Sequence, residues 1–441
     1  MRVLLTSNAV HVPPRGGSTR SNLVWLEHLA SRGHDCRIVA PAALRDTPQK
    51  EARVAADLED QRIRVHHIRT DPKLGFEVFK QGEITVYAAG DSSRVRAVLR
   101  EKILKLQPDW VLVSSEDLGQ VLLHQAQQTA PGRVVYLAHT PQMFPFGPAS
   151  LSPNPAGAAL VARAAGIVAI GNYTADYIER HLGRRPAVIH PPVYGPGPYA
   201  RRDPDQDGYV TMLNPSGVKG ISIFLALARR FPQYRFGALR GWGTTEEDFQ
   251  AMRQPGNITM LPKVKHIEAI LRKTKILLMP SLWPEGFGLI VMEAMLYGVP
   301  VVASDQGSLT EAKAGTRYVL PVRPIERYRT VFDENRMPVP VIPEQDIEPW
   351  ARAVEELMSD RELYRRESDA AREAAMKFVP TVRASAFEEF LVSLKPAEEA
   401  GAAPAVALDK VRGKSYEELS QERRALLAQK LRARMKPSGG G

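Results

Sequence analysis

Short apolar runs alternate along the chain with longer segments in which apolar residues recur every three or four positions. The runs predict strands and the longer segments predict helices. Before residue 190, the predicted strands are 2–6, 36–40, 63–68, 109–115, 133–139 and 166–170, and the predicted helices are 18–34, 92–106 and 174–183. This alternation is typical of a parallel sheet that helices cover on both faces.

The segment 191–208 breaks the rhythm because it is dense in Pro, Gly and Asp, and it is interpreted as a linker. Alternation then resumes. The predicted strands are 209–213, 234–239, 257–261, 275–280 and 299–304, and the predicted helices are 220–231, 266–274, the apolar stretch after Gly288, 346–360, 361–378 and one that ends near Leu394. Residues 323–345 are rich in Pro and are expected to form an irregular insertion.

The pattern therefore predicts two doubly wound α/β domains. The first covers 1–190 and the second 209–380, and 381–396 is expected to be a helix that returns towards the first domain. A chain of 441 residues is also too long for one ordinary core. Because ligands of open α/β sheets bind beyond the carboxyl ends of the strands, the residues after each strand are the candidates for chemistry.

Composition narrows the class of protein. Apolar residues make up 44% and charged residues 24%, as in soluble globular proteins. The single cysteine, Cys36, permits no intramolecular disulfide and fits a reducing compartment. The N-terminal apolar run is too short for a secretory signal, and no run approaches the about 18 residues of a membrane span. We expect a cytoplasmic protein.

The net charge of +10 is unevenly distributed. Residues 401–441 hold nine Lys or Arg and four Asp or Glu, so half of the excess lies in this tail. The rest of the chain has a weak basic bias and no basic motif studded with aromatic residues, so a nucleic-acid partner is not expected. An anionic membrane surface or a nucleotide phosphate accounts for the charge equally well.

Two candidate anion sites follow predicted strands. Gly16 and Gly17 precede the helix 18–34, whose first N–H groups can cradle an anion, although a tight turn is equally consistent. Lys219 lies at the start of the helix that follows strand 209–213. A cation beside free N–H groups suits a diphosphate, and the alternative is a solvated lysine beside a turn.

His139 ends the predicted strand 133–139, at the edge of the sheet where ligands bind. A role in the chemistry and a hydrogen-bonded structural role both fit this position. Phe144 and Phe146 follow it, and they either line an apolar acceptor pocket or pack in the core.

Two glutamates are the strongest signal for chemistry. Glu285 follows an apolar strand, and Glu293 stands after seven intervening residues, inside an apolar helix. Gly286 and Gly288 have no Cβ, so the backbone there can approach a ligand closely. A carboxylate among apolar neighbours needs hydrogen bonds, which the two hydroxyls of a ribose would supply. A buried structural glutamate is the competing interpretation of Glu293.

Residues 280–311, "PSLWPEGFGLIVMEAMLYGVPVVASDQGSLTE", resemble the E-x7-E signature of the retaining glycosyltransferases of family 4. The resemblance extends over about 1–395, because the glycine pair, the histidine and the Lys-Gly pair occur in the same order. It implies the GT-B fold, with two facing Rossmann-like domains and a cleft between them. It also implies transfer of a sugar, with retention, from a UDP-sugar or GDP-sugar to a hydroxyl of an unknown small molecule, lipid or peptide.

The resemblance implies that no metal is required. It also implies no cofactor, because the nucleotide sugar is a co-substrate. Two other functions stay open. One is epimerisation of a nucleotide sugar on the same fold, and the other is a non-catalytic role as a binding partner in a biosynthetic assembly line.

Carried over residue by residue, the resemblance places Glu285 on the hydroxyls of the donor sugar and His139 beside the reacting sugar. The donor-binding residues that it implies are Gly16, Gly17, Lys219, Phe287, Gly288, Leu289 and Glu293, of which Lys219 meets the diphosphate and Glu293 the ribose. One position departs from the family. Asn214 stands where many members have an arginine, and Arg240 is our candidate for the missing cation.

The tail is expected to have two parts. Residues 397–414 are poor in bulky side chains and predict a flexible linker, and 415–436 predict a basic helix with one apolar stripe. The helix resembles linker helices beside modules of nonribosomal peptide and polyketide assembly lines, which would place the enzyme in a natural-product pathway. Its charge suits an acidic protein or an anionic membrane surface, with the chain then peripheral to the inner membrane face. Packing on its own domain is the alternative.

Overall fold

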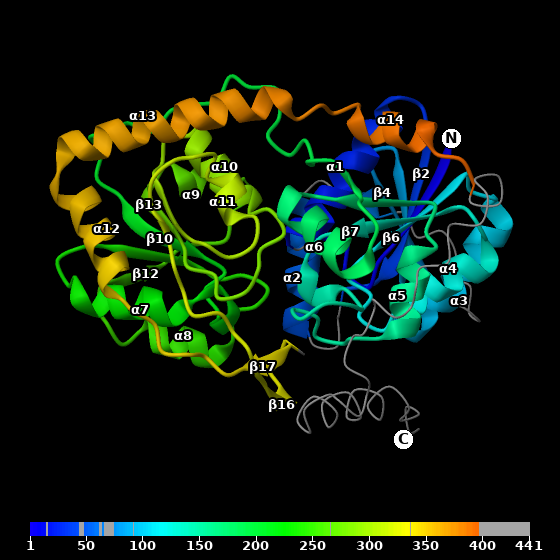
Figure 1. Cartoon of the computed structure of the whole chain (residues 1–441), viewed down its shortest axis with the longest axis horizontal. Helices are drawn as coiled ribbons and strands as arrows, with labels where there is room; N and C mark the ends of the chain where they lie inside the picture. The colour runs from blue at the N-terminus through cyan, green and yellow to red at the C-terminus, as the bar shows by residue number, and fades with distance from the viewer. Residues whose placement is uncertain are drawn as a thin grey trace. The chain divides into compact units, whose positions relative to one another are not determined.

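The computed structural model describes residues 1–14, 16–43, 48–60, 64–65, 75–90, 92–264, 266–335 and 337–396. They form two units. Unit 1 comprises the described residues of 1–195 and of 380–396, and unit 2 those of 196–379 (Figure 1). The predicted linker 397–414 and basic helix 415–436 lie outside the described residues.

Unit 1 is built on one mostly parallel sheet in the order β3-β4-β5-β2-β1-β6-β7-β8-β9. Its strands are β1 Arg2–Thr6, β2 Asp35–Pro41, β3 Arg64–Val65, β4 Phe76–Gln81, β5 Ile84–Ala89, β6 Trp110–Ser114, β7 Val134–Ala138, β8 Gly166–Ala169 and β9 Ala187–Val188. The β3–β4 and β4–β5 pairs are antiparallel, and the other pairs are parallel. The central strands β1, β6 and β7 are almost entirely buried, as expected where helices cover both faces.

The helices of unit 1 are α1 Gly17–Ser31, α2 Pro48–Asp60, α3 Ser92–Leu106, α4 Val121–Thr129, the 3₁₀ turn η1 Pro141–Met143, α5 Pro155–Ala162, α6 Asn172–Leu182 and α14 Ala386–Ser393. The last of them joins unit 1 from the far end of the described chain. Phe387 of α14 stacks on Trp25 of α1, with ring centroids 4.8 Å apart, and both side chains are buried. Aromatic pairs in this geometry contribute about 0.5–1.5 kcal/mol beyond the area that they bury.

Unit 2 has a six-stranded parallel sheet in the order β12-β11-β10-β13-β14-β15. Its strands are β10 Tyr209–Leu213, β11 Phe236–Leu239, β12 Ile258–Met260, β13 Thr274–Met279, β14 Val301–Ser304 and β15 Val319–Leu320. Its helices are the 3₁₀ turn η2 Gly217–Lys219, then α7 Ile221–Arg230, α8 Glu246–Met252, α9 Glu268–Leu271, α10 Leu289–Leu296, α11 Leu309–Ala312, α12 Glu348–Ser359 and α13 Arg361–Phe378. A further 3₁₀ turn, η3 Val379–Thr381, lies where unit 2 ends.

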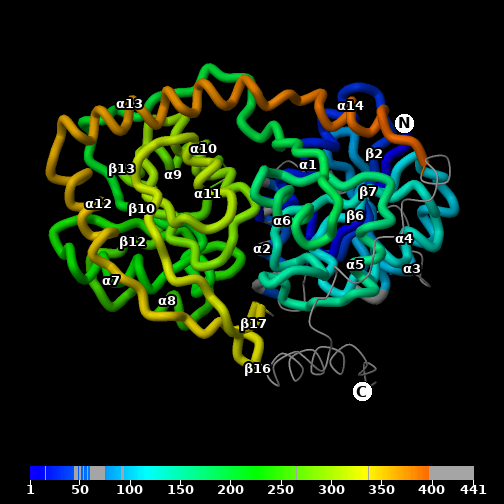
Figure 2. The backbone as a smooth tube through the Cα atoms, viewed as in Figure 1, coloured from blue at the N-terminus to red at the C-terminus, as the bar shows by residue number. Residues whose placement is uncertain are grey.

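The two α/β sheets predicted from the alternation of strands and helices are confirmed. One expectation is wrong, because the insertion 323–345 is not wholly irregular: β16 Tyr328–Phe332 and β17 Pro338–Pro340 pair as an antiparallel hairpin. Figure 2 traces this hairpin near α8. Of the predicted strand 63–68, only β3 is described, and the remaining residues lie outside the described part. None of the described helices combines the length and the apolar character that crossing a membrane requires.

Candidate functional site

The predicted lysine and the first glutamate of unit 2 meet at the carboxyl edge of its sheet. Lys219 ends the turn η2 after β10, and Glu285 lies in the loop between β13 and α10. The Lys219 Nζ donates to Glu285 Oε1 over 2.5 Å, and the hydroxyl of Ser281 donates to the same oxygen. The side chains of Lys219 and Glu285 are 16% and 9% exposed, so the ion pair is largely shielded from solvent.

A neighbouring loop braces Glu285. Gly307, which follows β14, forms an isolated parallel bridge with Glu285, and the Ser308 N–H donates to the Glu285 carbonyl over 3.0 Å. Gly307 has φ 65°, and a Cβ at this position would overlap the backbone N and O of Glu285. Only glycine fits here, so the close approach of the two loops depends on it.

The segment after Glu285 starts helix α10. Gly288 has φ 84° and caps the helix, and Leu289 is its first residue. The Phe287 side chain is 1% exposed and stacks on Phe378 of α13, with centroids 5.6 Å apart. Any ligand contact at Phe287 must therefore come from its backbone. Glu293 is buried on α10, at 7% exposure, as the apolar pattern predicts.

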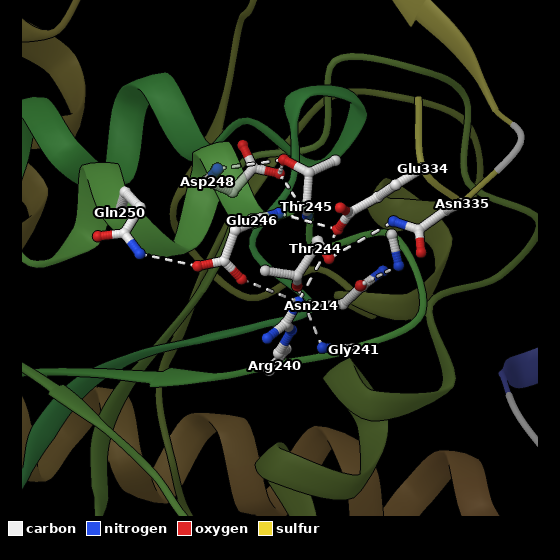
Figure 3. Close-up of polar contacts among 11 residues, drawn as sticks. Asn214, Arg240, Gly241, Thr244, Thr245, Glu246, Asp248, Gln250, Glu334 and Asn335 are labelled. Carbon is white, nitrogen blue, oxygen red and sulfur yellow. Dashed lines mark hydrogen bonds and ion pairs between the residues drawn. The ribbon is translucent and has the colours of Figure 1, made fainter. Parts of the chain in front are cut away.

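Asn214 and Arg240 lie in the loops after β10 and β11. Asn214 adopts φ 54°, and its Oδ1 accepts the Gly243 N–H over 2.8 Å. The Arg240 Nη2 lies 3.7 Å from a carboxylate oxygen of Glu246 and 3.9 Å from one of Glu334. Figure 3 shows these three side chains. Arg240 thus lies beside two carboxylates of its own unit.

The hairpin β16–β17 contributes to the same network (Figure 3). Glu334 lies between β16 and β17, and its carboxylate accepts the first N–H of α8 over 2.9 Å. The Asn335 side-chain amide donates to the Thr244 carbonyl over 3.4 Å. Thr245 caps α8 in a capping box with Asp248. The insertion therefore holds the loop that carries Arg240.

An aromatic pair adjoins the lysine of this edge. Trp242, in the loop after β11, stacks on Trp283, which precedes α10, with centroids 6.2 Å apart. The Lys219 Nζ lies 5.3 Å from the centroid of the Trp283 ring, within cation–π range. Trp242 is 39% exposed. Sequence reasoning missed both tryptophans, although each follows a predicted strand of the second half.

In unit 1, His139 directly follows β7 and is 1% exposed. Its Nε2 lies 2.9 Å from Asn22 Oδ1, and its backbone N–H donates to the Ser115 hydroxyl over 3.1 Å. The ring of Trp25 stacks on the imidazole of His139, with ring centroids 6.3 Å apart. Burial lowers the pKa of His139, which keeps the imidazole neutral near pH 7.

The polar contacts of His139 continue to the end of β6. Asn22 Nδ2 donates to Ser114 Oγ over 3.0 Å, and the Ser114 hydroxyl donates to Glu116. His11, after β1, is fully buried, and burial lowers its pKa to about 4. Asn22, Ser114 and Glu116 were not among the sequence candidates. The rule that singled out His139, polar residues at strand ends, also applies to Ser114 and Glu116.

The remaining candidates of unit 1 take ordinary positions. Gly16, with φ 94°, caps α1, and Gly17 is its first residue. Their role at a phosphate stays a prediction. Phe144 and Phe146 are buried with ring centroids 5.5 Å apart, so both contribute to the core. In the described part of the chain, no three His, Cys, Asp or Glu side chains are grouped to hold a metal ion.

Comparison with protein families matches both halves of the chain. Residues 15–194 match the model described as Glycosyltransferase Family 4, and 208–360 match Glycosyl transferases group 1. A stretch of 47 residues is 51% identical to an uncharacterized 41.2 kDa protein in the cps region of Klebsiella pneumoniae. That stretch spans 11% of this chain and 13% of the Klebsiella protein.

Several solved structures have the same arrangement of strands and helices as this chain. Three of them align with it over nearly their whole length. Sucrose-phosphate synthase from Thermosynechococcus elongatus has a TM-score of 0.62 at 14% identity, covering 88% of this chain and 98% of that one. Anabaena HepE in complex with UDP-glucose has a TM-score of 0.59 at 16% identity, covering 89% of this chain and 100% of that one. A glycosyltransferase from Rickettsia africae has a TM-score of 0.55 at 12% identity, covering 88% of this chain and 97% of that one. These likenesses show that the fold is GT-B.

Proposed function

We propose that this chain, a glycosyltransferase of the group 1/family 4 type, transfers a sugar from a nucleoside-diphosphate sugar to a hydroxyl of an acceptor, with retention at the anomeric carbon. The observation that carries this proposal is the ion pair of Lys219 with Glu285 at the carboxyl edge of the unit 2 sheet, followed by buried Glu293 on α10. A cation and two carboxylates suit a ligand that carries both phosphates and vicinal hydroxyls.

Lys219 would bind the diphosphate. Its ammonium group now pairs with Glu285, so the donor phosphates would compete with that carboxylate for the cation. In the transfer step, negative charge grows on the leaving phosphate oxygen. Lys219 and the backbone N–H groups of 287–289 would stabilise this charge in place, without reorganisation of solvent.

The two glutamates would read the two sugars of the donor. Glu285 has one oxygen occupied by Lys219 and Ser281, and its other oxygen would accept a hydroxyl of the transferred sugar. Glu293 would accept the two ribose hydroxyls, which offsets the cost of a carboxylate on an apolar helix. Anabaena HepE is a relative in fold solved with UDP-glucose, and we propose a UDP-sugar or GDP-sugar for this chain.

In unit 1, His139 would contact a hydroxyl of the substrates. The acceptor would be a small molecule, a lipid or a peptide. The basic segment 415–436 would recruit it through an acidic protein, such as a carrier protein of a natural-product pathway, or through an anionic membrane surface. Deletion of 397–441 should then lower transfer to the native acceptor and spare donor hydrolysis.

The first test is binding and hydrolysis of donors. Calorimetry with the full chain should show binding of a nucleoside diphosphate, and a screen of nucleotide sugars should show slow nucleotide release without an acceptor. Absence of binding at millimolar nucleotide would overturn the proposal. A product that keeps its nucleotide and changes only its sugar would identify an epimerase instead. The anomeric configuration of the transferred sugar, read by NMR, tests retention.

The second test separates the two glutamates. Glu293→Ala should weaken nucleotide binding by about 1.5–3 kcal/mol, the typical loss for a hydrogen bond to a charged group. Glu285→Ala should lower the rate of sugar transfer. It should not weaken nucleotide affinity, because it frees Lys219 for the phosphates. Glu344→Ala, at an exposed glutamate of the insertion, is the matched control and should change neither. Equal effects of the two site variants on both quantities would contradict the assignment.

A further inference from the structure

We propose that Asn22, Ser114 and Glu116 form a positioning relay in unit 1, which holds His139 as the tautomer protonated at Nε2. In this state His139 Nδ1 is the acceptor of a hydrogen bond from a substrate hydroxyl. The last contact rests on the proposed function, whereas the relay itself is a property of unit 1 that can be measured without any substrate.

The direction of the relay follows from what each group can donate. The Glu116 carboxylate only accepts, so the hydroxyl of Ser114 donates to it. Having used its proton, Ser114 Oγ must accept from Asn22, and the donor is the Asn22 Nδ2 at 3.0 Å. The amide of Asn22 is thereby oriented with Oδ1 towards His139. Because Oδ1 only accepts, His139 Nε2 carries the proton across the 2.9 Å between them.

The other ring nitrogen is then a lone-pair acceptor. Burial lowers the pKa of His139, so its ring is neutral and holds one proton, which the relay places on Nε2. His139 Nδ1 is buried and has no hydrogen-bond partner among the described residues. Buried polar groups in native proteins are rarely left without a partner. A substrate hydroxyl would complete the hydrogen bonding of His139.

A second histidine repeats the pattern from the end of β1. His11 Nδ1 lies 2.9 Å from the carbonyl of Ala9, which only accepts, so the proton of His11 is on Nδ1. Its Nε2 is buried and lacks a partner in the described part of the chain. His139 acts electrostatically to lower the pKa of His11, and the Glu116 carboxylate acts to raise the pKa of both histidines. Two lone pairs near a carboxylate attract the proton of a hydroxyl and repel an anion.

NMR of the full chain with ¹⁵N-labelled histidine tests the relay directly. The ring signals of His139, identified by their loss in His139→Gln, should show a protonated Nε2 and an unprotonated Nδ1 near pH 7. A protonated Nδ1 would overturn the relay. This readout needs neither donor nor acceptor, so it stands even if the proposed transfer reaction is not found.

Two variants should shift the titration of His139 in opposite directions. Glu116 is the charged group that acts on His139, and Glu116 and His139 both act on His11. Asn22→Asp places a carboxylate against Nε2 and stabilises the imidazolium, so His139 should titrate at higher pH. Glu116→Gln removes a negative charge, so His139 should titrate at lower pH. Loss of packing alone would not produce opposite shifts.

The acidic limb of the pH profile of kcat/KM should follow the NMR titration of His139, since protonation removes the lone pair of Nδ1 that accepts the substrate hydroxyl. Asn22→Leu should lower kcat/KM about tenfold to a hundredfold, mostly through kcat. Gln125→Leu, which removes another buried amide of unit 1, is the matched control and should leave the limb in place. If Asn22→Asp moves the NMR titration but not the acidic limb in an active enzyme, His139 does not contact the reacting hydroxyl and that part is overturned.

Discussion

The polar groups of the two units lie at equivalent edges of similar sheets, yet they differ in charge. In unit 1, His139 and His11 are buried and neutral, and their contacts are hydrogen bonds between uncharged groups except at Glu116. In unit 2, the central contact is an ion pair of Lys219 with Glu285, and Arg240 lies beside two carboxylates.

Because of this difference, we expect the two units to respond to different solution variables. A buried neutral histidine is perturbed by protons and hardly by salt, because its charged form is excluded by desolvation. A largely buried ion pair is itself screened little by salt. Binding of a phosphate from solution to the cation of that pair is perturbed by salt, because counterions screen the charge of the free phosphate. Unit 1 should therefore respond mainly to pH and unit 2 mainly to ionic strength.

Gly307→Ala should damage unit 2 most. The substitution combines left-handed strain, about 1–2 kcal/mol, with overlap against the backbone of Glu285, about 1–3 kcal/mol. Gly315→Ala is the control, because Gly315 also has positive φ, at 82°, but a Cβ there meets nothing within 4 Å. Urea unfolding should show a loss of roughly 2–5 kcal/mol for the first variant and about 1–2 kcal/mol for the second, which has the strain alone. Equal losses would show that the brace on Glu285 is not tight.

Acidification should destabilise unit 1 through His11. Its pKa in the folded state is about 4, against 6.5 for the ordinary group, so the unfolded chain takes up the proton first as the pH falls. The stabilisation is complete above pH 6.5 and is lost between pH 6.5 and 4, amounting to about 3 kcal/mol. Chemical unfolding at a series of pH values should show this slope, and His11→Asn should make it shallower. His139 adds a slope of the same sign. Parallel slopes in wild type and variant would contradict this origin.

Lys219→Met should remove the salt response of unit 2. The variant should lose about 1.5–3 kcal/mol of affinity for a nucleoside diphosphate, since a charge-assisted contact disappears. Titration calorimetry at several salt concentrations should show a strong dependence in the wild type and a weak one in the variant. The unit 1 variant Asn22→Leu should keep the salt dependence of the wild type. A variant affinity that still falls steeply with salt would point to another cation.

Glu334→Gln should have the smallest effect. Arg240 and Glu334 are both about half exposed, and pairs of this kind contribute at most about 1 kcal/mol to stability. If Arg240 is the second phosphate cation, its release from Glu334 should raise nucleotide affinity by about twofold, and Arg240→Ala should lower it. Asn335→Ala, which changes the same turn without changing charge, should leave nucleotide affinity unaltered. Unchanged affinity in both the Glu334 and Arg240 variants would remove Arg240 from the donor site.

The fold could be predicted where a single physical signal dominates. The buried strands β1, β6 and β13 are continuous apolar runs, and α3 and α13 are long periodic helices. The hairpin β4–β5 was missed, although alternating residues flank Gly82, which turns the chain with φ 57°. Hairpin β16–β17 was missed because its Pro content argues against strands, and an isolated edge pair tolerates proline.

The candidate site could be predicted only as separate residues. Glu285 and Glu293 stand out because a carboxylate in an apolar segment needs a reason, and the sequence shows both. Their partners do not stand out. Lys219 and Glu285 are 66 residues apart, and Asn22 and His139 are 117 apart, so neither contact follows from local pattern. The tautomer of His139 depends on the orientation of one amide, which only the three-dimensional structure supplies.

The stack of Phe387 on Trp25 has a consequence for the synthesis of the chain. Trp25 also lies against His139, so the packing around that histidine includes a residue made after all the described strands of both sheets. A ribosome that has completed all nine strands of the unit 1 sheet has not yet made α14. Unit 1 therefore lacks α14 while the whole of unit 2 is synthesised, and during that time Trp25 lacks the ring that stacks on it in the complete fold.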